Sequence, residues 1–173
     1  MSRAPVTIRR AEPRDAARLA LVGAASFLES FADDHGGDDV VAHVAAAHSA
    51  DFYAERLADP AHALWIAEAP RGAPVGYAWI GPATLPGSDA GDAELKRIYA
   101  LAPWHGSGLG RQLMELATAE AAARGHARLL LAVYEQNERA RAFYARAGFA
   151  EIGTTPFMVG ETRFTDLVLA RAL

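Results

Sequence analysis

The chain of 173 residues has no cysteine, only one lysine (Lys96) and no long apolar run. Without cysteine, neither a disulfide framework nor a zinc site with thiolate ligands can form. No segment approaches the ~20 apolar residues of a membrane-spanning helix, and the start, Met1 to Pro5, leads into no signal-like apolar stretch. We therefore expect no membrane association and a cytoplasmic location.

Positive charge is also in short supply. Lysine and arginine together number 17, against 21 aspartates and glutamates, which gives a net charge of −4. This balance leaves no basic stripe to neutralise a phosphate backbone, so nucleic acid is not expected as a partner. The same sign suits an amine or another cationic substrate.

The length fits one domain with a sizeable core, and no linker, repeat or low-complexity tract divides the chain. Apolar periodicity predicts an α/β (α+β) fold, a sheet with helices on its faces. Strands are predicted at 6–10, 62–69, 75–83, 92–101, 128–133, 149–152 and 164–170. Helices are predicted from Pro13 onward, from the acidic loop 33–39 to about Ala58, and over 109–124 and 137–147.

A glycine-rich turn, His105 to Arg111, joins the fourth predicted strand to the helix that follows it. Small residues let the backbone approach a ligand, and the unpaired N–H groups of a helix start attract a phosphate. The spacing lacks the third glycine of a dinucleotide loop and the Gly-Lys-Ser/Thr of a Walker loop. The turn therefore indicates a phosphorylated ligand of another kind, with a simple tight turn as the alternative.

Two motifs in this order resemble the GNAT superfamily of acyl-CoA-dependent N-acetyltransferases. The first is Glu94 to Ala100 with Pro103 and the glycine turn, and the second is Asn137 to Tyr144 running into Gly148 and Phe149. The resemblance implies the GNAT fold over a single domain, 1–173. That fold is a mixed sheet of about seven strands that parts between the fourth and fifth, flanked by about four helices. His105 departs from the family's usual Gln or Arg.

The resemblance implies acetyl-CoA as the cofactor. Its pyrophosphate would lie on the backbone of the turn, and its pantetheine arm would pair with the fourth strand like an extra strand. A backbone N–H near Ile98 could stabilise the oxyanion of the reaction. The cofactor-binding positions implied are Ile98, Tyr99, Ala100, His105, Gly106, Ser107, Gly108, Leu109, Gly110, Arg111, Asn137, Ala140, Phe143 and Tyr144.

Tyr144 is the candidate general acid, because a phenol stays protonated at neutral pH and can give its proton to the departing thiolate. Asn137 and Tyr144 are seven residues apart and would share one helix face. Glu94 is the candidate base, acting through ordered water, since ~13 Å of strand separates it from Ile98. The alternatives are a core aromatic for Tyr144 and a strand charge paired with Lys96 or Arg97 for Glu94.

The acceptor site is less defined. The resemblance assigns it to the segment between the first two helices together with the loop before the last strand. In the first of these, Glu29, Asp33, Asp34, Asp38 and Asp39 would orient a cationic amine, as in polyamine-type or small-amine acetyltransferases. A merely solvated acidic loop is the alternative. His35 lacks a second well-placed ligand, so no metal is expected. Candidate lining residues, with core packing as their alternative, are Phe27, Glu29, Phe31, Trp79 and Tyr134.

Three functions remain open after this reading. An N-acetyltransferase acting directly on a small cationic amine is favoured by Tyr144, and a transferase acting on a protein amine would use the same residues. A non-catalytic acyl-CoA sensor would need the glycine turn alone. A homodimer also stays open, whereas a nucleotide-dependent oxidoreductase would require the missing dinucleotide pattern.

Overall fold

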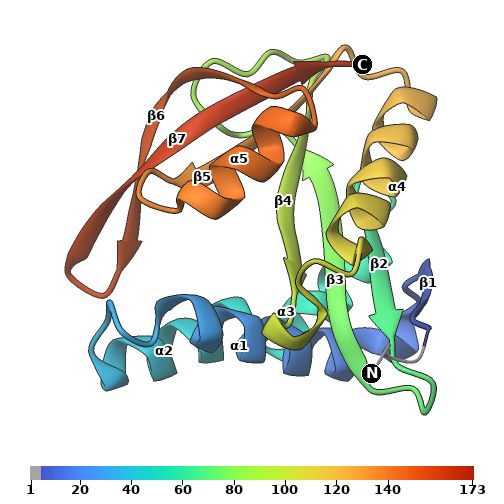
Figure 1. Cartoon of the computed structure of the whole chain (residues 1–173), viewed down its shortest axis with the longest axis vertical. Helices are drawn as coiled ribbons and strands as arrows, with labels where there is room; N and C mark the ends of the chain where they lie inside the picture. The colour runs from blue at the N-terminus through green and yellow to red at the C-terminus, as the bar shows by residue number, and fades with distance from the viewer. Residues whose placement is uncertain (1–4) are drawn as a thin grey trace.

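The computed structural model describes residues 5–173. Seven strands form one mixed sheet in the order β1-β2-β3-β4-β5-β7-β6 (Figure 1). All neighbours pair antiparallel except β4 and β5, which are parallel. The predicted fold class is confirmed. The strands are β1 Thr7–Arg10, β2 Ala63–Glu68, β3 Pro74–Pro82, β4 Ala93–Ala100, β5 Arg128–Tyr134, β6 Ala150–Val159 and β7 Thr162–Ala172.

Helices cover both faces of the sheet. They are α1 Ala16–Phe31, α2 Gly37–Ala47, α3 Ala50–Ala58, α4 Leu109–Ala123 and α5 Glu138–Arg146, with 3₁₀ turns at Pro13–Asp15 and Ala102–Trp104. One core cluster packs α4 and α5 against one face, with Leu113 and Leu129 fully buried. A second cluster packs α1 and α3 against the other face around Leu19 and Tyr77. The hairpin of β6 and β7 reaches down to α2 (Figure 1).

Three predicted boundaries were wrong. The helical region expected to run to Ala58 divides into α2 and α3, because the Ser49 hydroxyl accepts the Phe52 N–H and starts a new helix. Asp38 and Asp39, expected in a loop, lie in the first turn of α2, where the helix dipole favours carboxylates. The last two strands are longer than expected, because β6 is an edge strand and tolerates Pro156 within its length.

The parting of β4 from β5 is confirmed and is abrupt. The two strands pair only at Ala93–Leu129 and Glu94–Leu130. Beyond that point β4 stays with β3 as far as Ala100, and β5 stays with β7 as far as Tyr134. The β3–β4 register shifts between Leu95 and Arg97, which marks a bulge at Lys96. From this bulge onward one edge of β4 has no neighbouring strand.

A half-buried arginine ties two helices, α2 and α3, to β4 on the α1 face. The Arg97 guanidinium donates to the Ala47 carbonyl at the end of α2 and to the Tyr53 hydroxyl on α3, at 2.8 Å each. Burial, with the charge of Arg97 second, lowers the pKa of His48 to about 3, so this neighbouring imidazole is neutral. A Cβ on Gly23 would stand 2.5 Å from both the His48 ring and the Tyr53 hydroxyl. Only glycine fits there.

The start of α1 is fixed by a buried ion pair. Arg9 on β1 donates to both carboxylate oxygens of Asp15, at 2.7 and 2.8 Å, and to Glu68 on β2 at 2.9 Å. The Asp15 side chain is fully buried, and the hydrogen bonds from Arg9 lower its pKa to about 2. Because this value lies below the ordinary one, the stabilisation is present above pH 4 and is lost as the pH falls from 4 to 2.

We predict that Asp15→Asn lowers the free energy of unfolding at pH 7 by about 3 kcal/mol, since it removes the charge of a fully buried carboxylate that pairs with the half-buried Arg9. The difference from the unsubstituted protein should shrink as the pH falls toward 2. Urea unfolding at pH 7 and pH 3 measures both effects. Glu55→Gln, which removes an exposed pair with Arg56, is the control and should cost less than about 0.5 kcal/mol. Equal losses for the two variants would contradict the prediction.

Candidate active site

The glycine turn presents unpaired donors at the start of α4. Gly106 and Gly108 have φ of +75° and +86°, in the left-handed region that favours glycine. No side chain caps α4. Four N–H groups find no protein acceptor within residues 5–173: those of Gly106, Gly108, Gly110 and Arg111. Such a set at the positive end of a helix fits a phosphate or pyrophosphate.

His105, which departs from the family's pattern, ties this turn to β4 and α5. Its Nε2 lies 2.7 Å from the Ala100 carbonyl, and its Nδ1 meets an Arg139 N–H. A carbonyl only accepts, so Nε2 carries the proton and Nδ1 accepts from Arg139. One neutral imidazole therefore links the end of β4 to the first turn of α5.

The free edge of β4 carries backbone groups directed away from β3. The Leu101 N–H donates to the Val75 carbonyl at 2.9 Å, so alternation turns the N–H groups of Tyr99 and Arg97 toward β3 as well. The N–H and C=O groups of Ile98 and the N–H of Ala100 then face the side where β5 has departed, whereas the Ala100 carbonyl on that side accepts from His105. Such an edge can pair with an extended ligand.

Helix α5 brings Tyr144 to the same region. Its side chain is 9% exposed and packs between Phe143 and Phe149, and its hydroxyl makes no hydrogen bond to residues 5–173. Burial first, and Tyr99 second, raise the pKa of Tyr144 above its ordinary value. The ring of Phe143 lies 3.7 Å from where a Cβ of Gly110 would stand, so α5 meets the start of α4.

Asn137 has a different place from the one expected. It precedes α5 as its N-cap, and its side-chain oxygen accepts the Ala140 N–H at 3.1 Å. Its side-chain oxygen is thus engaged by the helix it caps. Its capping bond fixes where α5 begins, which sets the position of Tyr144 two turns later.

Glu94 lies where β4 and β5 separate, with its carboxylate already engaged. Its Oε2 accepts from the Thr84 N–H at 2.8 Å and from the Thr84 hydroxyl at 3.1 Å, and it pairs with Lys96 at 2.8 Å. The side chain is 10% exposed. Of the two readings of the sequence, these contacts favour the charge paired with Lys96, in a buried rather than an exposed setting.

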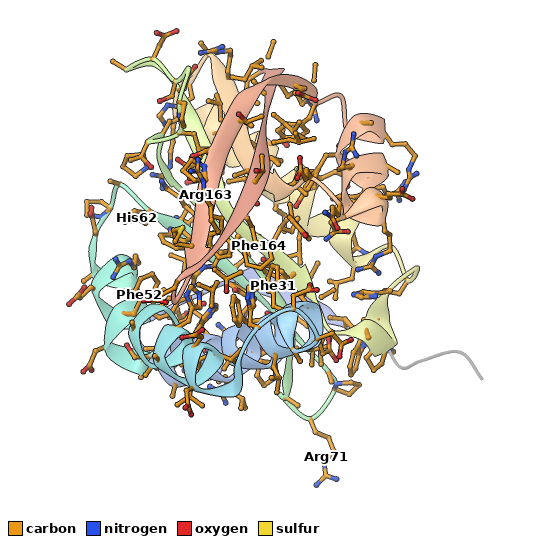
Figure 2. All side chains as sticks on the ribbon, turned by 90° about the vertical axis from the view of Figure 1, so that its left-hand side faces the viewer. Phe31, Phe52, His62, Arg71, Arg163 and Phe164 are labelled. Carbon is orange, nitrogen blue, oxygen red and sulfur yellow. The ribbon has the colours of Figure 1, made fainter. Side chains whose placement is uncertain are left out.

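The aromatic candidates for the acceptor site separate into two groups. Phe27 and Phe31 on α1 lie 4.8 Å apart between ring centres, and His35 in the turn after α1 packs against Phe31 and Phe164. Figure 2 shows Phe31 and Phe164, which come from α1 and β7, in the same region. Tyr134 at the end of β5 meets the other side of Phe164.

Trp79 lies apart from this group. It packs against Phe52 on α3, and its indole N–H donates to His62. Glu29 accepts the Ala102 N–H at 3.0 Å, which joins α1 to the segment after β4.

The sequence reading missed Asp166, on β7 opposite Tyr134. It lies in the segment 164–170, which the sequence predicts as a closing strand, and a carboxylate among the apolar residues of that strand is the signal that could have identified it. One of its oxygens, Oδ1, is buried without a hydrogen-bond partner. Both ring nitrogens of His35 are also buried without a hydrogen-bond partner.

Among residues 5–173, no group of three or more His, Cys, Asp or Glu side chains is placed to hold a metal ion. Over the same range, no helix is both long enough and apolar enough to cross a membrane.

Comparison with known proteins agrees with this geometry. Residues 24–149 match the sequence profile of the Acetyltransferase (GNAT) family. An uncharacterised N-acetyltransferase of Mycobacterium tuberculosis is 36% identical over 159 residues, 92% of this chain and 98% of that protein. Another, of Lactobacillus delbrueckii subsp. lactis, is 26% identical over 97% of this chain and 98% of its own length.

Solved structures share the fold. The PaiA N-acetyltransferase of Thermoplasma acidophilum, in complex with coenzyme A, superposes with a TM-score of 0.80 at 18% identity, over 98% of this chain and 99% of that one. The ribosomal-protein-S18-alanine N-acetyltransferase of Escherichia coli superposes with a TM-score of 0.70 at 19% identity, over 97% and 94%. The glycine turn, the free edge of β4 and these relatives agree: the chain belongs to the GNAT family of N-acetyltransferases.

Proposed function

We propose that this protein transfers the acetyl group of acetyl-CoA, the usual donor of the family, to the primary amino group of a small cationic molecule. The observation that carries the proposal is the parting of β4 from β5. It leaves a free backbone edge between the unpaired N–H groups of the glycine turn and the phenol of Tyr144.

The residues present fit the cofactor. The N–H groups of Gly108, Gly110 and Arg111 would hold the pyrophosphate at the positive end of α4. The backbone of Ile98 and Ala100 would pair with the pantetheine arm, and a β4 N–H would stabilise the oxyanion. When bound, acetyl-CoA supplies a thioester carbonyl for attack by the amine.

Tyr144 would act as the general acid. Because burial raises its pKa, the phenol is protonated throughout the neutral range and can give its proton to the departing thiolate. Its hydroxyl makes no competing hydrogen bond to residues 5–173. Phe143 and Phe149 hold the ring from its two sides.

For Glu94 we propose a structural role. Three donors converge on its Oε2, from the backbone and hydroxyl of Thr84 and from Lys96. A carboxylate so engaged at the last pair of β4 and β5 secures the point where the strands separate.

The acidic turn after α1 supports a cationic acceptor. Asp34 lies close enough to Tyr134 for its charge to contribute to raising the pKa of that phenol. Asp38 is exposed and Asp39 half-buried in the first turn of α2. These charges would draw an ammonium group toward the site. We further propose that residues 1–173 act as one domain in the cytoplasm; residues 1–4 lie outside the described range.

A protein amine is the second candidate acceptor, because a neighbour in fold is named for acetylating a ribosomal-protein alanine. A screen of thiol release from acetyl-CoA with small amines and with peptides that have a free N-terminal alanine separates the two. We predict saturable turnover with at least one small cationic amine and none with the peptides. Turnover with peptides alone would transfer the proposal to protein amines. Tight cofactor binding without any turnover would make the protein a sensor.

The glycine turn gives a test of the cofactor site. Alanine at Gly108 must adopt φ near +86°, which costs about 1–2 kcal/mol and shifts the unpaired N–H groups. We predict that Gly108→Ala weakens coenzyme A binding, measured by calorimetry, by about tenfold. Gly125→Ala is the matched control, since Gly125 has φ +80° and open space at the far end of α4. Equal affinity in both variants would place the pyrophosphate elsewhere.

The proposed acid is tested by removing one oxygen. We predict that Tyr144→Phe lowers kcat by about 100-fold, the usual contribution of a general acid, and leaves the Kd of coenzyme A within about twofold, because the ring packing is retained. Steady-state kinetics and calorimetry measure the two quantities. Thr118→Val, which removes an unpartnered hydroxyl on α4 outside the proposed site, should not reproduce this loss. An unchanged kcat for Tyr144→Phe would exclude the phenol as the proton donor.

A further inference from the structure

A carboxylate on β7 stands in the region where the sheet has parted. Tyr134 and Asp166 form the last pair of β5 and β7, four residues beyond the last pair of β4 and β5 at Leu130. At Tyr134, β5 is no longer paired with β4. Asp166 therefore belongs to the part of the sheet that borders the free edge of β4.

The direction of the Asp166 side chain follows from its strand. Leu167 and Leu169 pack into the core beneath α4 and α5, whereas Val168 and Ala170 pack on the opposite face. Side chains alternate along a strand, so Asp166 points with Val168 to the face covered by α1. Its charge acts on Tyr99 of β4, which lies across the parting.

The Asp166 carboxylate lacks a hydrogen-bond donor. Its Oδ1 is buried without a hydrogen-bond partner, and no Lys or Arg among residues 5–173 pairs with it. Two more deeply buried aspartates, by contrast, have both carboxylate oxygens engaged: Asp15 with Arg9, and Asp92 with Arg128. A buried and unpartnered carboxylate oxygen is costly, so a ligand that donates hydrogen bonds would satisfy it.

We propose that Asp166 binds the ammonium group of the acceptor and takes its proton. The inference rests on the proposed function and adds the group that selects and activates the amine. Tyr134, Phe164 and His35 form an aromatic wall beside the carboxylate, which suits the alkyl part of such an amine. The two unpartnered ring nitrogens of His35 offer one further polar contact.

The proton balance assigns a step to each residue. Asp166 accepts one proton from the ammonium nitrogen, and the freed lone pair forms the C–N bond with the thioester carbon. The C–S bond then breaks, and Tyr144 gives its proton to the thiolate. The second nitrogen proton restores Tyr144, and Asp166 releases its proton to water. One proton is released per acetyl group transferred.

The protonation of Asp166 is suited to this step. Burial first, and the charge of Glu135 second, raise its pKa to about 6. The group is therefore ionised at neutral pH and is a stronger base than an exposed aspartate. The titratable groups that face this region from β4, from β5 and the loop after it, and from the turn after α1 are Tyr99, Tyr134, Glu135, Asp34 and His35.

Two isosteric amines test the proposal on the full-length protein with acetyl-CoA. Butylamine is protonated at pH 7.5, whereas O-propylhydroxylamine has the same length and a neutral amino group. We predict that Asp166→Asn lowers kcat/KM for butylamine by about 100-fold and changes it little for O-propylhydroxylamine, which has no proton to lose before attack. The inflection of the acidic limb near pH 6 should disappear for butylamine.

Stability supplies an independent readout. Because the native pKa of Asp166 lies above its unfolded value, ionisation destabilises the protein as the pH rises from 4 to 6. Asp166→Asn should therefore raise the melting temperature at pH 7.5 by about 3 °C, with no gain at pH 4. A residue needed only for folding would lower both stability and activity. Glu151→Gln, an exposed carboxylate on β6, is the control and should change neither quantity.

The outcomes separate this inference from the proposed function. If the unsubstituted protein acetylates butylamine and Asp166→Asn does so equally well, the inference is overturned and the proposed function stands. Equal loss with both amines, or a lower melting temperature, also overturns it. If the unsubstituted protein acetylates neither amine and no amine of the wider screen, the proposed function fails, and the inference with it.

Discussion

The site depends on one constraint: β4 and β5 pair at two positions and then separate. An unpaired strand edge inside a protein is normally avoided, because its N–H and C=O groups lose water without gaining partners. Here each strand is held by its other neighbour, β4 by β3 and β5 by β7, so the sheet remains continuous through only two residue pairs. Glu94 engages Thr84 and Lys96 at one end of the parting, and His105 links Ala100 to Arg139 at the other.

The parting lets two faces of the sheet contribute to one reaction. On the α4 face, the helix start and Tyr144 offer donors that suit phosphate and a thiolate. On the α1 face, Asp166 offers an acceptor that suits an ammonium group. Tyr99 on β4 lies close to both sets of residues. The charge of Asp166 contributes to raising the pKa of Tyr99, and Tyr99 in turn contributes to raising the pKa of Tyr144. A continuous sheet would keep them apart.

Backbone features of the site could be predicted from the sequence, whereas its side-chain contacts could not. The glycine turn was recognisable because Gly106 and Gly108 adopt a conformation that few other residues tolerate. The role of His105 depends on Arg139, 34 residues away, and that of Asp166 on the register between β5 and β7. Shifting that register by one residue would turn Asp166 to the other face. No local pattern fixes such a register, and the capping role of Asn137 was likewise hidden by its resemblance to a ligand-binding position.

Arg97 and Asp166 differ in whether the fold supplies their hydrogen-bond partners. Both are charged groups on the α1 face with no partner of opposite charge among residues 5–173. The Nη1 group of Arg97 nonetheless has its acceptors, the Ala47 carbonyl at the end of α2 and the Tyr53 hydroxyl, and the rings of Phe52 and Trp79 lie against the guanidinium. Asp166 keeps a bare oxygen. A group that serves only the fold is expected to complete its hydrogen bonds within the fold, so the incomplete group is the one available to a ligand.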